Sequence, residues 1–151
     1  MVQYYEDLEP GAEFEVGTFT LRKDEIVEFA ERFDPQPFHM DEQAASESMF
    51  GQLIASGLHT LCVATRVFTE EYLQAEDNVA IMGGVGIDQL RWHQPVAPGQ
   101  DLTLGVEIQA KSDEDCHPDG GYVDFKRTVA NADGEPVMTD LSRGIIEKRS
   151  A

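Results

Sequence analysis

The sequence has few cysteines, few lysines and no long apolar run, and each shortage excludes a class of protein. Its two cysteines, Cys62 and Cys116, are too few for a disulfide framework, and the apolar pattern around Cys62 favours a buried, reduced thiol. No apolar stretch reaches the roughly 18 residues of a membrane span, and the first residues, MVQYYEDLEPG, contain no signal segment. These shortages predict a soluble cytoplasmic protein with no membrane partner.

Metal and nucleotide sites lack the residue patterns that they need. The four histidines and two cysteines show none of the paired spacings of a zinc site, so we expect no metal. The glycines of MGGVGID, residues 82–88, lie in a strand pattern with no helix after it. They favour a curved strand at a close helix or subunit contact over a phosphate loop.

Positive charge is also scarce, because 29 acidic residues face 11 basic ones, of which only four are lysines. The net charge of −18 argues against nucleic acid and anionic membranes as partners. Carboxylates spread along the whole chain, with few lysines, are typical of a salt-rich cytoplasm in which ions screen their repulsion. We therefore interpret the charge as a halophilic adaptation.

The length of 151 residues suits one domain, residues 1–151, that can bury a sizeable core. Periodicity predicts a strand at 14–21, a helix that ends before Pro35, a short helix capped by Asp41, and a long helix over 58–74. Four further strands are expected at 79–92, 101–111, 122–132 and 136–148. This order predicts an α+β domain whose curved antiparallel sheet wraps around one long helix.

The segment FDPQPFHMD, residues 33–41, combines two prolines with an acid and an imidazole. Each proline has a fixed φ and keeps its neighbour out of helical geometry, so the segment should be a stiff loop. In such a loop Asp34 and His39 could hold and polarise one water molecule. Taken alone, the D-x4-H spacing favours the structural alternative, in which Asp34 caps the loop and His39 packs against Asp41 or a backbone carbonyl.

Gly57 lies where the long helix begins, in GQLIASGLHT. The N–H groups of a first helical turn have no partner within the helix and lie at the positive end of its dipole. Such a group could stabilise an oxyanion, and a glycine lets a ligand come close to the backbone. A plain helix start explains the same residue and, from local sequence alone, is the better explanation.

Taken together, DPQPFHMDEQAA, GQLIASGLHT and RWHQPVAPGQDLTLGVEI resemble the MaoC-like, R-specific enoyl-CoA hydratases of the hotdog fold, over about residues 5–147. The family pattern reads D-x-N-P-x-H-x-D, a helix-opening H-G or S-G, and P-V-x-x-G-D. The resemblance implies that Asp34 and His39 form the catalytic pair and that Gly57 binds the oxyanion. Two positions depart from the pattern, since Gln36 replaces the usual Asn and Ser56 stands where many members have His.

The implied activity is a hydro-lyase reaction, the reversible addition of water to a trans-2-enoyl-CoA to give an R-3-hydroxyacyl-CoA. Coenzyme A is then part of the substrate, and no separate cofactor is expected. We favour Asp34 as the base, although the residues alone leave the choice between Asp34 and His39 open. A thioesterase on the same fold and a non-catalytic acyl-CoA binding module are the alternatives. The expected substrate contacts are Gln36, Phe38, Ser56 and His59.

The resemblance also implies a homodimer or an assembly of dimers, with two sheets joined edge to edge and an acyl-CoA tunnel at the interface. A coenzyme A substrate carries several negative charges, so this acidic chain needs a local basic contact for it. The candidates are Arg66, Arg91 and Lys126.

Overall fold

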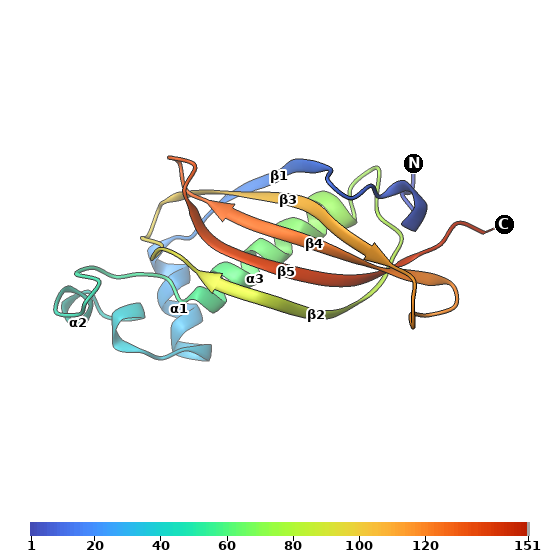
Figure 1. Ribbon diagram of the computed structural model, residues 1–151. Helices are drawn as coiled ribbons and strands as arrows, with labels where there is room; N and C mark the ends of the chain where they lie inside the picture. Colours follow the sequence, from blue (N-terminus) through green and yellow to red (C-terminus); the bar gives the residue numbers. More distant parts are fainter. Residues whose placement is uncertain (151) are drawn as a thin grey trace.

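The computed structural model describes residues 1–150, in which one sheet curves around a central helix (Figure 1). Its strands are β1 (Glu13–Thr20), β2 (Ile81–Trp92), β3 (Asp101–Ser112), β4 (Gly120–Ala130) and β5 (Pro136–Glu147). Its α-helices are α1 (Lys23–Phe33), α2 (Glu42–Ser46) and α3 (Gly57–Phe68). Short turns of 3-10 helix lie at Tyr5–Asp7 and Pro37–His39, and a π-helical turn lies at Thr69–Leu73.

The sheet has the strand order β1-β3-β4-β5-β2, and every neighbouring pair is antiparallel. Helix α3 lies along one face of the sheet, while α1 and α2 lie at the end opposite both chain termini (Figure 1). Alternate side chains of β3 and β4 are buried under α3, including Leu104, Val123 and Phe125. The predicted α+β architecture, a curved antiparallel sheet around one long helix, is confirmed.

The residues predicted to end or cap helices do so at the predicted positions. Helix α1 ends at Phe33, before Pro35, and the Asp41 carboxylate caps α2 by accepting a hydrogen bond from the Gln43 N–H at 2.9 Å. The predicted helix at 58–74 is instead α3 followed by the π-helical turn. Residue periodicity cannot distinguish a π turn from an α turn, because only the hydrogen-bond register differs.

The buried face of α3 leaves out some of the apolar residues of this helix. His59, Thr60, Ala64, Val67 and Phe68 are buried, whereas Leu58 is 42% exposed and Cys62 is also exposed. The prediction of a buried Cys62 is therefore wrong. Apolar residues occur on more than one side of this helix, so its periodicity alone does not say which side meets the sheet.

Strand β2 forms an open edge of the sheet in the single chain. Its apolar side chains Ile81, Met82, Val85 and Ile87 are each at least 38% exposed. A Cβ added at Gly83, Gly84 or Gly86 would have no heavy atom within 4 Å, so these glycines make no close helix contact. Of the two contacts predicted for these glycines, a helix contact is absent from the described chain, and a subunit contact stays a prediction. Among residues 1–150, no helix is long and apolar enough to cross a bilayer.

A buried ion pair fixes α3 against the sheet. Arg127 of β4 donates two hydrogen bonds to the Asp140 carboxylate of β5, at 2.9 and 2.7 Å, and a third to the Thr65 hydroxyl of α3 at 3.0 Å. Both charged side chains are at most 1% exposed. Because a buried charge without its partner is costly, this network holds α3 at one rotation about its axis.

We expect the fold to depend on salt. The 29 acidic residues cannot all find partners among 11 basic ones, so uncompensated carboxylates oppose the compact state at low ionic strength. Lowering KCl from about 3 M to about 0.1 M lengthens the screening distance roughly fivefold and should cause loss of structure. Far-UV circular dichroism across this range provides the measurement. Full retention of structure at the low end would contradict the halophilic interpretation.

Candidate active site

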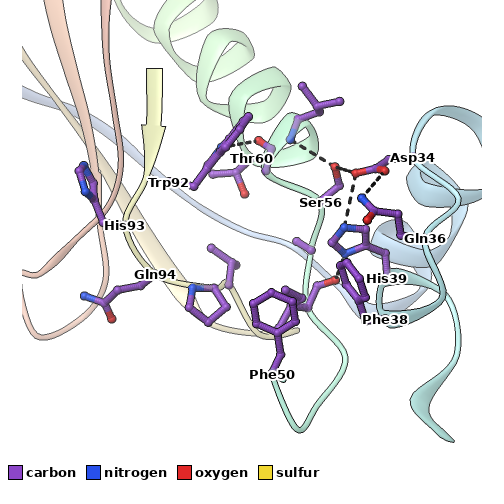
Figure 2. Close-up of a pocket in the computed structure, with 16 residues that line it drawn as sticks. Asp34, Gln36, Phe38, His39, Phe50, Ser56, Thr60, Trp92, His93 and Gln94 are labelled. Atoms are coloured by element: carbon purple, nitrogen blue, oxygen red, sulfur yellow. Dashed lines mark hydrogen bonds and ion pairs between the residues drawn. The ribbon is translucent and has the colours of Figure 1, made fainter. Parts of the chain in front are cut away.

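A cavity of about 620 Å³ lies beside the N-terminus of α3, at the end of the sheet where α1 and α2 lie (Figures 1 and 2). Three segments meet there: the loop after α1, the chain leading into α3, and the end of β2 with the residues that follow it. The lining residues are Asp34, Gln36, Phe38, His39, Phe50, Ile54, Ala55, Ser56, Gly57, Leu58, Thr60, Trp92, His93, Gln94, Pro95 and Val96.

The loop after α1 has the stiffness predicted for it. Asp34 is the C-cap of α1, and its N–H donates to the Ala30 carbonyl at 2.9 Å. Pro37 then begins the 3-10 turn that carries His39. Fixed proline φ angles and a short helical turn leave the chain little freedom between the two side chains.

His39 is held in one orientation by its backbone contact. Its side chain is 5% exposed, and Nδ1 lies 2.8 Å from the Ile54 carbonyl oxygen. Because a carbonyl only accepts hydrogen bonds, Nδ1 must carry the proton. Nε2 is then the free acceptor of the neutral ring, and it lies 3.4 Å from Oδ2 of Asp34 (Figure 2). The carbonyl contact proposed as a structural alternative thus exists, and it directs Nε2 towards Asp34.

The Asp34 carboxylate receives a donor on each oxygen (Figure 2). The Ser56 hydroxyl donates to Oδ2 at 2.6 Å, and the Gln36 amide donates to Oδ1 at 2.8 Å. The Ser56 hydrogen bond is the largest influence on the pKa of Asp34, and it lowers that pKa. Partial burial raises the pKa, while the Gln36 hydrogen bond and the His39 ring lower it further. Asp34 is therefore ionised at neutral pH, and whenever the His39 ring is uncharged a water in contact with both groups would meet two acceptors.

Replacing Ser56 with Ala should raise the pKa of Asp34. Because hydrogen bonds lower the folded-state pKa, Asp34 contributes stability above its unfolded pKa, and this contribution is lost as pH falls through the folded value. In the Ser56→Ala variant the folded-state pKa lies nearer the unfolded one, so this contribution should be smaller and should be completely lost at a higher pH. The acidic limb of any activity profile that needs ionised Asp34 should move up in pH with it.

The same substitution also removes a helix cap, since the Ser56 hydroxyl accepts from the Leu58 N–H at 3.3 Å. Loss of such a cap costs about 1 kcal/mol of stability. The control is Ser48→Ala, which removes a hydroxyl that accepts from a backbone N–H, that of Phe50 at 3.2 Å, and lies outside the cavity lining. Thermal unfolding at several pH values distinguishes the two effects, because only Ser56→Ala should shift the pH dependence. If thermal stability depends on pH in Ser56→Ala as it does in wild type, the Ser56 hydrogen bond does not lower the pKa of Asp34.

Gly57 begins α3 as predicted, and Trp92 explains why a glycine is required there. The Trp92 indole N–H donates to the Gly57 carbonyl at 2.9 Å, and a Cβ on Gly57 would lie 2.3 Å from ring atom Cε2. The aromatic ring thus fills the space into which a side chain at position 57 would project. The Gly57 N–H belongs to the first turn of α3 and has no partner within the helix.

The other residues predicted to contact substrate lie in different places. Phe38 and Gln36 line the cavity, and the Phe38 ring packs edge-on against His39 at 4.5 Å. Ser56 lines it too, with its hydroxyl on Asp34. His59 is not among the lining residues, because its ring turns inwards and stacks on Phe29 of α1.

Sequence reasoning missed several lining residues, among them Trp92 and His93. His93 is exposed, yet it lines the cavity and its Nε2 lies 2.7 Å from the Thr139 hydroxyl. A signal for both exists in RWHQPV, since a proline directly after a strand often marks where the chain leaves the sheet.

Comparison with known proteins gives consistent matches. The family model described as MaoC like domain matches residues 7–126. The "Uncharacterized protein YdeM" of Bacillus subtilis is 35% identical over 101 residues, which are 67% of this chain and 70% of that protein.

Solved structures agree with these sequence matches. The MaoC-like dehydratase from Rhodospirillum rubrum is 30% identical, covers 99% of both chains and has a TM-score of 0.85. The R-hydratase PhaJ1 from Pseudomonas aeruginosa has a TM-score of 0.74 over 97% of this chain and 86% of its own, but its 22% identity shows only the shared fold. The expected hotdog architecture is thereby confirmed, and the matches support a hydratase or dehydratase in general terms. Because the family match covers most of the chain, including the Asp34–His39 loop and Gly57, this chain belongs to the MaoC-like domain family.

Proposed function

We propose that this protein is an R-specific 2-enoyl-CoA hydratase, which adds water reversibly to a trans-2-enoyl-CoA. The observation that carries the proposal is the pairing of Nε2 of His39 with Oδ2 of Asp34 at 3.4 Å, at the wall of a largely apolar cavity. Two fixed acceptors side by side are what a nucleophilic water needs, because it donates one O–H to each while its lone pair remains free.

The proposed reaction gives a role to Asp34, His39 and Gly57. The Asp34–His39 pair takes a proton from water while the water oxygen forms a bond to C3 of the enoyl thioester. The electron pair of the C2=C3 bond moves onto the thioester oxygen, where the unpaired N–H of Gly57 stabilises the charge. Return of the electrons and transfer of the proton to C2 complete the 3-hydroxyacyl product, so atoms and electrons balance.

The enzymatic alternative is a thioesterase, which would direct the same water at the carbonyl carbon and release free thiol. The third possibility is a binding module that keeps the cavity without turnover. A single assay with crotonyl-CoA separates the three. We expect loss of the conjugated-thioester absorbance without thiol release, and a product of R configuration by chiral analysis. Thiol release would identify the thioesterase, and binding without either signal would identify the module.

We further propose that two copies of this chain pair through β2. Strand β2 has an unpaired edge, and its exposed side chains Met82, Val85 and Ile87 make that edge apolar. Leu58, at the start of α3, is 42% exposed and also lines the active cavity. Pairing at β2 would cover these apolar groups and place the partner beside the site.

Sedimentation equilibrium in high salt should therefore give a dimer or a multiple of it. Val85→Glu would place a carboxylate in the proposed interface and should shift the protein towards monomer, because burying an unpaired charge is costly. The control is Thr18→Glu, which places a carboxylate at an exposed position of β1, at the other edge of the sheet. A wild-type mass of only 16.8 kDa would contradict the pairing.

The three basic residues suggested for coenzyme A phosphates lie in different settings. Arg66 already pairs with Glu70 at 3.1 Å, and Lys126 lines a separate cavity over β1, β3 and β4. Arg91 directly precedes Trp92 at the cavity end of β2, and its guanidinium donates to the Leu90 carbonyl. Arg91 is thus the best placed of the three for a phosphate contact.

A further inference from the structure

Helices α1 and α3 meet through two stacked rings. Phe29 of α1 and His59 of α3 lie parallel, with centroids 4.7 Å apart and an interplanar angle of 4°. His59 is only 7% exposed, so the stack lies inside the protein. Neither ring lines the active cavity.

Each helix holds part of the site close to this stack. Asp34 caps the C-terminal end of α1, and Ser56 caps the N-terminal end of α3. The ring of Phe33, the residue before Asp34, packs on Phe29 with centroids 5.1 Å apart. Aromatic contacts therefore run from the neighbour of Asp34 to His59, beside the 2.6 Å hydrogen bond between Asp34 and Ser56.

His59 has the properties of a neutral packing ring. Its Nδ1 is buried and has no hydrogen-bond partner among the described residues. Burial lowers the pKa of His59, against an opposing effect of Glu25, so the ring is uncharged at neutral pH.

We propose that His59, through its stack on Phe29, is a positioning residue that sets the position of Asp34 relative to Ser56. This inference rests on the proposed function, because the position of Asp34 relative to Ser56 affects a reaction rate only if Asp34 is catalytic. Helices slide past one another when a contact at their crossing is lost, and a catalytic group displaced by about 1 Å can lose up to about 10²-fold in rate. The ring itself, and not its titration, is the property required.

Kinetics of two His59 variants test the proposal. In His59→Ala, kcat with crotonyl-CoA should fall by about 10- to 100-fold while KM changes less, because the chemistry depends on the Asp34 position more than binding does. His59→Phe keeps an aromatic ring for the stack and should remain within a few-fold of wild type. Phe29→Ala should resemble His59→Ala, and the double variant should be little worse than either single one, since both remove one contact.

A measurement without substrate separates this inference from the proposed activity. The pKa of the Asp34 carboxyl, followed by carbon-13 NMR, reports its bonds to Ser56 and Gln36 and the nearby His39 ring. It should rise in His59→Ala and Phe29→Ala and stay near wild type in His59→Phe. The control is Val67→Ala, which removes a buried side chain from the sheet-facing part of α3 and should leave the Asp34 pKa unchanged.

Two results would overturn the proposal. An Asp34 pKa in His59→Ala equal to that of wild type would show that the stack does not position the carboxylate. A fall in kcat in folded His59→Phe as large as that in His59→Ala would show that an imidazole nitrogen is needed. If His59→Ala does not fold, His59→Leu keeps the buried volume without a ring and provides the same comparison.

Discussion

Replacing Asp34 with Asn or His39 with Ala is expected to lower kcat for an enoyl-CoA by about 10² to 10⁴, the usual contribution of a general acid or base. Asn keeps the shape of Asp34 but offers an amide N–H in place of one acceptor oxygen. Ala at position 39 removes the Nε2 acceptor that lies 3.4 Å from Asp34. KM should change far less, because neither group is needed to enclose the acyl chain.

Both groups serve the same water molecule, so their effects should not add. The double variant Asp34→Asn with His39→Ala should be little slower than the slower single variant. Activity must be corrected for folded protein by circular dichroism, since His39 is buried. Matched controls are Asp41→Asn and His117→Ala, which make the same types of change outside the cavity. A kcat near wild type in either single variant would refute the mechanism, and a structural capping pair would lose thermal stability instead.

Substituting Gly57 should damage the protein through Trp92. A Cβ at this position would meet three atoms of the indole ring at 2.3 to 2.6 Å, which a folded protein does not accept without moving the ring. Helix propensity alone predicts that Gly57→Ala gains up to about 1 kcal/mol. Overpacking costs about 1 to 3 kcal/mol, so we expect a net loss of stability. Gly57→Val should impair binding and turnover together, because both the α3 terminus and a wall of the cavity move.

A double-mutant cycle identifies the ring as the cause. In a Trp92→Ala background the space above Gly57 is empty, so adding Gly57→Ala should then cost little or nothing. The control is Gly105→Ala, whose Cβ would meet its nearest neighbours at 3.9 Å, an ordinary contact. Chemical unfolding of the four variants gives the coupling energy. Equal costs of Gly57→Ala in both backgrounds would contradict the role of Trp92.

The sequence by itself determined the features that depend on a few neighbouring residues. Pro35 ends α1, Asp41 caps α2, and Gly57 begins α3, because proline φ, a capping carboxylate and a change of period act over one helical turn. The same local stiffness keeps Asp34 and His39 within reach of each other. The alternation of the later strands also identified the antiparallel sheet.

Only the tertiary structure decided how these pieces meet. Ser56 reaches Asp34 across 22 positions and Trp92 reaches Gly57 across 35, and no local signal encodes either distance. The crossing of α1 and α3 turned His59 inwards onto Phe29, although the sequence analysis expected it to contact substrate. Helix periodicity likewise left open which side of α3 meets the sheet, because a helix with apolar residues on several sides is oriented by its packing partners and by the buried Arg127–Asp140 pair.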